Sequence, residues 1–529
     1  MADFISKVKV NGVTANIKDA SLTTALNTEK TTRANADTTL QRNIDAEASA
    51  REAADAVLQD EIDALSAASA YYAVNTVADM QALTDVKTGA IISTRGYYAV
   101  NDGGAGRYYV TATGTIDNYL SYGVAGKVAN LIHSDGEIVV NQIGAHGDGE
   151  TDDTAVINWA LQNFIMTKGM TGSEYLISAT LFIPYGHSFD GQECTIRTVS
   201  MADFTAHGIA IDSKVRKLAM WLEGREPING SEHAGYTKEV KNFKLVEANV
   251  DAGDDPTNNS GGLYLGYKTP LTGTNSKVNN SVYGYFLSNI SIVGFRCGLY
   301  LSEAWDTKID GVKIRDMLSE GIACFGQSVN IYWTNCNVDG RNRINTVGAD
   351  YNASPNYANR PEGHLYTGCA FFSCTYGFRQ SSALSIQLSN CMLDLHNVAA
   401  ITIYVGDMMV TNCWLSSKTG VATYQVSNSA VQLNSVATVS PGNKFTAVNC
   451  HIVNRNDNQL AQPGAVMQGY NRYADIISDC TIEGSARQLH SNAALRLINN
   501  SLDNDSTIYT TGNGVRSGNY RASTGAVVA

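Results

Sequence analysis

The chain has 529 residues, 44% of them apolar and only 17% charged, which is enough for a large core and more than one domain. Its net charge of −12 argues against a broad nucleic-acid-binding surface. The first residues lack the apolar segment of a secretory signal, and no run of 18 apolar residues indicates a membrane span. We therefore expect a protein that is made in the cytoplasm, does not insert into membranes and does not bind nucleic acid.

Residues 1–20 are predicted to form a small N-terminal anchor. Asn11-Gly12 lies between alternating residues in VKVNGVTANI (8–17), which is a strong signal for a two-residue hairpin.

Residues 21–66 repeat with a period of 18 residues, visible in the apolar pairs Leu22/Leu26, Leu40/Ile44 and Leu58/Ile62. Eighteen residues complete five helical turns, which predicts a nearly straight supercoil. The apolar stripe is too narrow for the core face of a globular helix, so we interpret it as a multi-chain coiled coil. A single solvated helix is the alternative.

Residues 70–135 are expected to form a small β-rich collar. Its segment NDGGAGRYYV (101–110) is rich in glycine but lacks the Lys-Ser/Thr of a phosphate loop, and no helical pattern follows it. We therefore expect glycine-mediated turns there.

The segment GAHGDGETDDTAVINWAL (144–161) predicts a tight turn followed by an amphipathic helix. Thr151 is the expected N-cap, with Asp152 and Asp153 in the first helical turn, where the helix dipole favours carboxylates. Such a helix could cover the open end of a solenoid. We expect these carboxylates to be structural rather than catalytic.

From residue 286 onward, one six-residue frame recurs, as in LSNCML (388–393). Most intervals between frames are 20–24 residues, which is typical of a solenoid; the frame positions are 290, 312, 336, 369, 391, 413, 450, 480 and 500. Six of them are cysteines, and an asparagine precedes most positions. Units of about 22 residues with period-2 alternation fit one coil of a parallel β-helix.

Three interpretations of the cysteine frame compete: disulfides, metal ligands or a stacked structural column. Cytoplasmic cysteines are usually reduced, and the spacing lacks the close pairs of zinc sites. We therefore expect the cysteines to pack inward as small apolar residues, and the asparagines to form a second ladder whose amides satisfy turn backbone groups.

The GDGETDDT segment closely resembles the opening motif of the pectate-lyase-like superfamily of right-handed parallel β-helices. Together with the collar segment GYYAVNDGGAGRYYV (96–110) and the coiled coil, the chain resembles a bacteriophage tail spike over roughly residues 70–505. The resemblance implies an all-β, right-handed parallel β-helix over 136–505, with a C-terminal tail at 506–529. It also implies a homotrimer in the virion that contacts phage tail or baseplate proteins through its N-terminus and recognises bacterial surface polysaccharide.

Outward-facing positions of the frame supply one candidate site. If positions 0 and +2 point inward, +1 and +3 point outward. Position +3 holds Asp339 and Asp394 two coils apart, ~9.6 Å at ~4.8 Å per coil, near the upper limit of ~6.5–9.5 Å for an inverting glycosidase pair. Arg315 flanks this pair, and His396 follows Asp394.

A second candidate group lies one segment earlier. Asp306 and Asp310 follow Trp305, while Lys308 and Tyr332 share position −4 on neighbouring coils, which would suit a lyase base and its cation. Trp414, outward at position +1, could stack on a sugar or lie in a subunit interface. Outward aspartates on a β-helix commonly only cap turns or face solvent.

The sequence thus predicts catalytic and substrate-binding candidates and no cofactor or metal ion: Asp306, Asp310, Asp339 and Asp394 as catalytic residues, and Trp305, Arg315, Tyr332, His396 and Trp414 as substrate-binding residues. Carboxylate-assisted glycosidic hydrolysis is favoured over elimination. The alternatives are a non-enzymatic receptor-binding or structural spike, a polysaccharide lyase, and a secreted bacterial lyase or adhesin.

Overall fold

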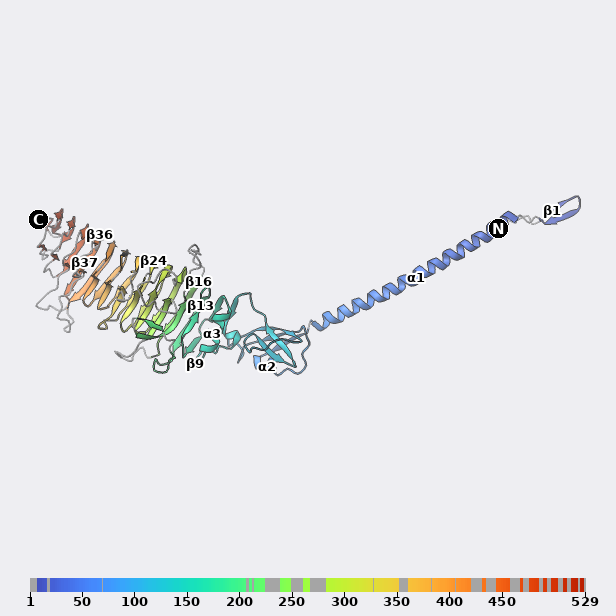
Figure 1. Ribbon diagram of the computed structural model, residues 1–529, viewed down its shortest axis with the longest axis horizontal. Helices are drawn as coiled ribbons and strands as arrows, with labels where there is room; N and C mark the ends of the chain where they lie inside the picture. The colour runs from blue at the N-terminus through green and yellow to red at the C-terminus, as the bar shows by residue number, and fades with distance from the viewer. Residues whose placement is uncertain are drawn as a thin grey trace.

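The molecule is long and narrow, with a terminal hairpin, one long helix, a small β domain and a stack of strands in series (Figure 1). The computed structural model describes residues 7–16, 20–68, 70–205, 209–211, 214–223, 238–248, 260–266, 282–326, 328–351, 360–381, 383–404, 406–419, 431–433, 444–456, 467–469, 475–484, 489–491, 496–502, 508–510, 515–521 and 524–527.

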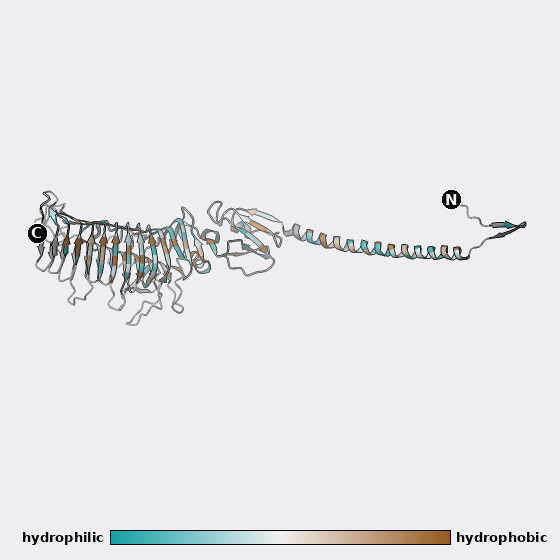
Figure 2. Ribbon diagram, turned by 90° about the horizontal axis from the view of Figure 1, so that it is seen from above, coloured by the Kyte–Doolittle hydropathy of each residue, from teal (hydrophilic) through white to brown (hydrophobic). Residues whose placement is uncertain are grey.

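The hairpin and the long helix that the sequence predicts at the N-terminus are both present. Strands β1 (Lys7–Val10) and β2 (Val13–Asn16) pair antiparallel around Asn11-Gly12, both with positive φ. Helix α1 (Ala20–Ala68) follows, and Figure 2 shows hydrophobic and hydrophilic residues alternating along it. Ion pairs four residues apart stabilise the helix: Glu29–Arg33 at 2.7 Å and Glu47–Arg51 at 2.5 Å.

The collar is a five-stranded sheet in the order β3-β4-β5-β7-β6. Its strands are β3 (Tyr71–Val74), β4 (Ile91–Thr94), β5 (Arg107–Thr111), β6 (Ser121–Val124) and β7 (Lys127–Leu131), with the short helix α2 (Val77–Gln81). Thr76 and Asp79 form a capping box at the start of α2. Tyr108 and Tyr122 are buried and meet edge to face, with 5.8 Å between ring centroids.

The solenoid begins with β8 (Glu137–Val139), the 3-10 turn η1 (Val140–Ile143) and β9 (Asp148–Asp152), followed by helix α3 (Thr154–Asn163). Helix α3 packs Ile157, Ala160 and Leu161 into the core at this end of the stack. The predicted covering helix is therefore confirmed. Strands β10 (Met166–Lys168), β11 (Glu174–Ile177), β13 (Ser188–Thr198), β16 (Lys238–Val246), β18 (Val282–Tyr283) and β19 (Tyr285–Val293) form the first coils.

Each later coil has three short parallel strands, which we call A, B and C. The A strands are β21 (Ala304–Asp310), β24 (Val329–Thr334), β27 (Glu362–Thr367), β30 (Ser385–Ser389), β33 (Asp407–Thr411), β36 (Phe445–Val448), β39 (Ile476–Ser478), β42 (Arg496–Ile498) and β45 (Val515–Ser517). The B strands are β22 (Lys313–Arg315), β25 (Asn337–Asp339), β28 (Ala370–Phe372), β31 (Met392–His396), β34 (Trp414–Thr419), β37 (His451–Asn456), β40 (Thr481–Gly484), β43 (Ser501–Leu502) and β46 (Tyr520–Arg521).

The C strands form a separate sheet, which also includes strands from the first coils: β12 (Leu181–Ile183), β15 (Lys214–Glu223), β17 (Ser260–Gly266), β20 (Cys297–Ser302), β23 (Glu320–Phe325), β26 (Val347–Tyr351), β29 (Tyr376–Gln380), β32 (Ala399–Ile403), β35 (Val431–Leu433), β38 (Met467–Gly469), β41 (Leu489–Ser491) and β44 (Ile508–Thr510). Strand β14 (Ile209–Ile211) pairs antiparallel with β15. The chain is therefore a parallel β-helix, as predicted.

The cysteine frame is the inner column between the A and B strands. All ten cysteines are free and buried, which confirms the structural interpretation. Neighbouring coils are joined through this column, because Cys391 N donates to Cys413 Sγ at 3.2 Å. The preceding asparagines have positive φ, for example 54° at both Asn335 and Asn412, so they form the bend between the A and B strands.

The β-helix continues past residue 505, where the sequence analysis placed a C-terminal tail. Strands β45 and β46 extend the A and B ladders. The boundary was misplaced because the last coil replaces both marker residues. Gly518, with φ 70°, stands at the bend, and Asn519 at the inner column, where its Oδ1 accepts from Asn500 N at 3.0 Å.

Across the part of the chain that the structure describes, no helix is both long and apolar enough to cross a membrane.

Candidate functional site

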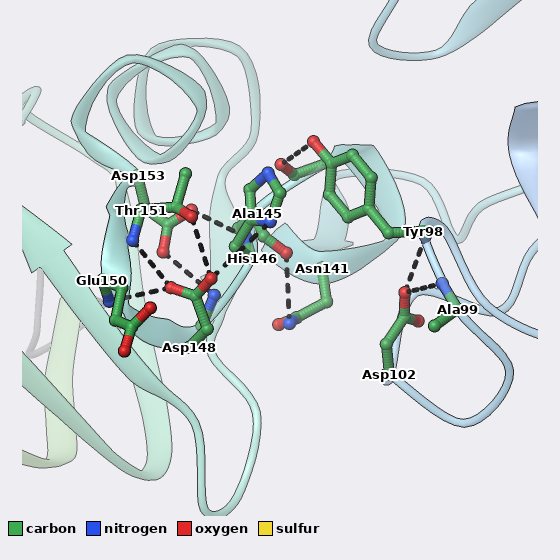
Figure 3. Close-up of polar contacts among 12 residues, drawn as sticks. Tyr98, Ala99, Asp102, Asn141, Ala145, His146, Asp148, Glu150, Thr151 and Asp153 are labelled. Atoms are coloured by element: carbon green, nitrogen blue, oxygen red, sulfur yellow. Dashed lines mark hydrogen bonds and ion pairs between the residues drawn. The ribbon is translucent and has the colours of Figure 1, made fainter.

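Asp148 and Asp153, two carboxylates of the 144–161 motif, accept hydrogen bonds from backbone amides (Figure 3). Asp148 Oδ1 accepts from Thr151 N at 2.8 Å and Glu150 N at 2.9 Å, and these bonds lower the pKa of Asp148 to about 2. Asp153, which is buried, accepts from His146 N at 2.7 Å and Gly147 N at 3.0 Å. Asp153 also stands at the N-cap of α3, so the predicted N-cap at Thr151 was wrong; Thr151 bonds to Asp148 instead.

The same motif joins the collar to the β-helix. The ring of Tyr98 stacks on His146 with 3.9 Å between centroids, and Tyr98 Oη donates to Gly144 O at 3.0 Å (Figure 3). Burial raises the pKa of Tyr98 to about 12. These contacts give Tyr98, His146, Asp148 and Asp153 structural partners.

Asp306 lies at a bend in the chain. Its φ is 47°, and the equivalent Asn330 on the next coil has φ 54°. Asn330 Nδ2 donates to Asp306 Oδ1 at 3.0 Å. Asparagine and aspartate tolerate this left-handed conformation better than most residues, so the position explains the residue type without any chemistry.

Asp310 supports the asparagine ladder. It accepts from Thr334 Oγ1 at 2.7 Å and from Asn335 Nδ2 at 3.1 Å. On its own coil the ladder position is Gly311, with φ 64°, which has no side chain to receive the Asn335 amide. The Asp310 carboxylate therefore takes the place of the missing amide.

The other candidates on the A strands lie as the frame predicts. Lys308 and Tyr332 are direct neighbours in the register of β21 and β24, and both are exposed. Trp305 is half-buried against Tyr283, with ring centroids 5.6 Å apart.

The outer surface of the B strands, which we call the B face, carries an outward column of +3 residues on four successive coils. Strand register aligns Arg315 with Asp339, Asp339 with Phe372, and Phe372 with Asp394. The two aspartates therefore lie two coils apart, ~9.6 Å along the axis. Asp339 Oδ1 accepts from Arg341 N at 2.8 Å.

The basic end of the B face is centred on a buried aspartate. Asp316 lies 2.9 Å from Arg341 Nε and 4.0 Å from Arg315 Nε, while both arginine side chains are about half exposed. Arg315 thus flanks the Asp339 position, as predicted. Asp316 was not identified from the sequence, because it follows strand β22, at the bend after that strand.

Asp394 is bonded to the following coil. Its Oδ1 accepts from Trp414 Nε1 at 3.0 Å and from the Ser416 hydroxyl. These bonds tie the carboxylate to the following coil and hold Trp414 in one orientation on the B face.

His396 does not face outward. Its side chain is fully buried and packs against Gly377. A Cβ added to Gly377 would lie only 2.7 Å from His396 Nε2. The strict alternation that we assumed is broken by Leu395, whose φ is 60°, and the β31–β34 register shifts between Leu393 and His396. The prediction that His396 contacts substrate was therefore wrong for this structure.

His451 is a B-face residue that the sequence analysis missed. It follows Cys450 as Trp414 follows Cys413, and the two are direct neighbours in the β34–β37 register. The frame position alone could have identified it. The +3 residues on the two coils after Asp394, Ser416 and Val453, are both buried.

No group of three or more His, Cys, Asp or Glu side chains within the described ranges is arranged to hold a metal ion.

Comparisons with known proteins give structural matches only. No protein-family model matches the chain, and no curated protein sequence does. The tailspike gp42 of Acinetobacter phage vb_AbaP_AS12 matches with a TM-score of 0.55 and 15% identity, covering 87% of this chain and 78% of that one. The enzymatically active domain of tailspike protein 2 from bacteriophage CBA120 matches with a TM-score of 0.50 and 13% identity, covering 84% and 61%.

The enzymatically active domain of CBA120 tailspike protein 4 matches with a TM-score of 0.46 and 13% identity, covering 97% of this chain and 57% of that one. This chain thus spans less than two thirds of either CBA120 protein. At 13–15% identity, the matches to gp42 and to tailspike protein 2 show a shared fold and nothing about activity. The chain therefore has the parallel β-helix fold found in phage tailspike proteins.

Proposed function

We propose that the chain is a phage tail spike that binds bacterial surface polysaccharide, a capsule or O-antigen, and cleaves its glycosidic bonds by hydrolysis. The observation that carries this proposal is the B face, where two outward aspartates flank an aromatic ring on a rigid scaffold. The fold shared with tailspike proteins supports the same reading by analogy.

Hydrolysis requires one carboxylic acid to protonate the leaving oxygen and one carboxylate to activate water. In our proposal Asp339 and Asp394 perform these roles; their two-coil spacing of ~9.6 Å lies at the upper limit for an inverting pair and is too long for a retaining pair. Asp394 Oδ2 accepts no hydrogen bond from a described residue, so it is available to substrate. Arg315 would bind an anionic substituent beside Asp339.

The secondary candidates are Asp306, Asp310 and Trp305. The two aspartates rank lower because each already accepts a hydrogen bond from the next coil. A lyase is the second candidate function, and the adjacency of Lys308 and Tyr332 favours it. In that case Tyr332, of which 39% is exposed, would abstract the proton and Lys308 would stabilise the uronate. A spike that only binds its receptor is the third possibility.

We further propose that α1 forms a trimeric coiled coil and that residues 1–20 attach the spike to the phage tail or baseplate. The repeating apolar side chains of α1 are all more than half exposed in the single chain, namely Leu22, Leu26, Leu40, Ile44, Leu58 and Ile62. Such a stripe requires a partner helix. The β-helix is expected to be right-handed, the hand that parallel crossovers favour.

Replacing the two aspartates tests the proposed hydrolysis. Asp339→Asn and Asp394→Asn should each reduce the cleavage rate ~10²–10⁴-fold, because each removes a proton-transfer group. Asp407→Asn, an outward aspartate on strand β33, is the matched control and should keep the wild-type rate. Cleavage at the wild-type rate by both B-face variants would refute the assignment.

A further inference from the structure

Four side chains on consecutive B strands form one contact chain, which we call the B-face row: Asp394 (β31), Trp414 (β34), His451 (β37) and Glu483 (β40). Trp414 Nε1 donates to Asp394 Oδ1 at 3.0 Å. The Trp414 and His451 rings meet edge to face with 4.4 Å between centroids. His451 Nε2 lies 3.2 Å from Glu483 Oε2, at ion-pair distance but without hydrogen-bond geometry.

The row reaches the surface of the chain. The side chains of His451 and Glu483 are 32% and 51% exposed, and Trp414 is half-buried. Met392, the register neighbour of Trp414 on the preceding coil, is 44% exposed. An aromatic ring, two carboxylates and an imidazole thus lie together over four coils.

The orientation of Trp414 is fixed before any ligand binds. Asp394 Oδ1 accepts from both the indole N–H and the Ser416 hydroxyl, and that hydroxyl oxygen in turn accepts from Leu395 N at 2.9 Å. Ser416 is buried, so the support beneath the indole is rigid. A ring held in this way loses little conformational freedom when it stacks on a ligand.

We propose that the B-face row is a saccharide-binding subsite that extends the Asp339–Asp394 site along the helix axis; this inference rests on the proposed function. A sugar ring presents C–H groups to an aromatic face and hydroxyl groups to carboxylates, and the row offers both kinds of partner in the Trp414 ring and the exposed Glu483 carboxylate, with His451 packed between them. Charged residues are depleted at the centre of protein–protein interfaces, whereas three of the four residues in the row are ionisable. A saccharide therefore fits the row better than a second copy of the chain.

The test is binding of the full-length protein to an array of bacterial capsular and O-antigen oligosaccharides. On the oligosaccharide that the wild type binds, Trp414→Ala should raise Kd roughly tenfold. His451→Ala and Glu483→Gln should each raise it roughly threefold to tenfold. Met409→Ala, an exposed apolar residue on the neighbouring strand β33, is the control and should leave Kd unchanged.

Far-ultraviolet circular dichroism of each variant checks that the β-helix is intact, and Trp414→Phe provides a ring-retaining variant if Trp414→Ala fails to fold. Phenylalanine keeps an aromatic face but loses the bond to Asp394, so it should give an intermediate Kd. Wild-type affinity in folded Trp414, His451 and Glu483 variants would overturn the subsite and leave the proposed function standing. If the wild type binds and cleaves no polysaccharide, the proposed function itself fails, and the subsite with it.

Discussion

At the scale of single residues, one buried polar network lies on strands β26 and β27 of the β-helix. Tyr351 Oη lies 2.8 Å from His364 Nδ1 and 2.5 Å from Tyr366 Oη, and His364 Nε2 lies 3.1 Å from Ser328 O. All three rings are buried. Burial lowers the pKa of His364 to about 4, because the imidazolium would lose its hydration.

His364 should make the protein less stable in mild acid. Between pH 6.5 and about 4 the unfolded chain binds a proton at this histidine that the folded chain does not. The free energy of unfolding should therefore fall by about 1.4 kcal/mol per pH unit in that window. Urea unfolding of the wild type and His364→Gln at several pH values measures the slope, and His133→Gln, at an exposed histidine, is the control. Equal slopes for the wild type and His364→Gln would contradict the assignment.

The sequence alone identified outward aspartates but not the hydrogen bonds that they make. Those bonds depend on which residues occupy the bends of neighbouring coils. The frame predicted correctly that Asp310 and Asp339 are outward. It could not show that Asn335 needs an acceptor on the preceding coil, because that need arises from Gly311 on another coil. His396 was misplaced because a single left-handed residue, Leu395, reverses the alternation. Such a bulge has no clear signal when the residue is not glycine or asparagine.

At the scale of elements, the B and C strands approach each other closely at a column of glycines. A Cβ on Gly321 would lie 2.4 Å from Val338 Cγ1 and 2.7 Å from Gly348 O. These distances leave no room for a methyl group unless the two sheets move apart. The glycines of the C strands are therefore needed for the inner packing of the solenoid.

Gly321→Ala should lower the free energy of unfolding by about 1–3 kcal/mol, the usual cost of overpacking a core. Gly114→Ala in the collar is a suitable control, because its Cβ would meet Val128 only at ordinary contact distance, 3.5 Å. Thermal unfolding of both variants gives the comparison. A Gly321→Ala protein as stable as the control would show that the sheets can separate without cost.

The coil architecture was predictable because its signal repeats. Each cysteine of the frame marks one inward position. Because the frame repeats along the chain, the strand register and the length of each coil can be read from this one sequence. A coil without the Asn-Cys pair cannot be recognised in this way. The last coil has Gly518 and Asn519 at these two positions, so the sequence did not reveal it. Contacts between coils, such as the row from Asp394 to Glu483, depend on side-chain directions that the frame does not encode.

At the scale of the whole molecule, a long helix precedes a folded body that consists of the collar and the β-helix. The collar is bonded to the β-helix through Tyr98 and His146, so the two form one unit. Helix α1 extends beyond this unit with its apolar residues exposed (Figure 1). In our proposal the helix assembles three chains, and the β-helix binds the polysaccharide.

A chain lacking residues 1–66 should keep its fold and any cleavage activity but lose attachment to the virion. Light scattering after size exclusion should give the mass of three chains for the full-length protein, and weaker association for Leu40→Lys/Ile44→Lys, which disrupts the apolar stripe. Ala34→Lys is a control at a small helix residue outside the apolar pairs. Loss of the β-sheet circular dichroism signal in the truncated chain would contradict this division of roles.

The most direct test of the central claim is the product that the purified protein releases from polysaccharide. Capsular and O-antigen polysaccharides are incubated with the protein while new reducing ends and the ultraviolet absorbance of unsaturated uronates are followed together. Hydrolysis on the B face predicts reducing ends without absorbance. Reducing ends accompanied by absorbance would contradict hydrolysis and indicate elimination, for which Lys308 and Tyr332 are the candidate residues. The absence of both signals on a polysaccharide that the protein binds would contradict catalysis and leave a binding spike.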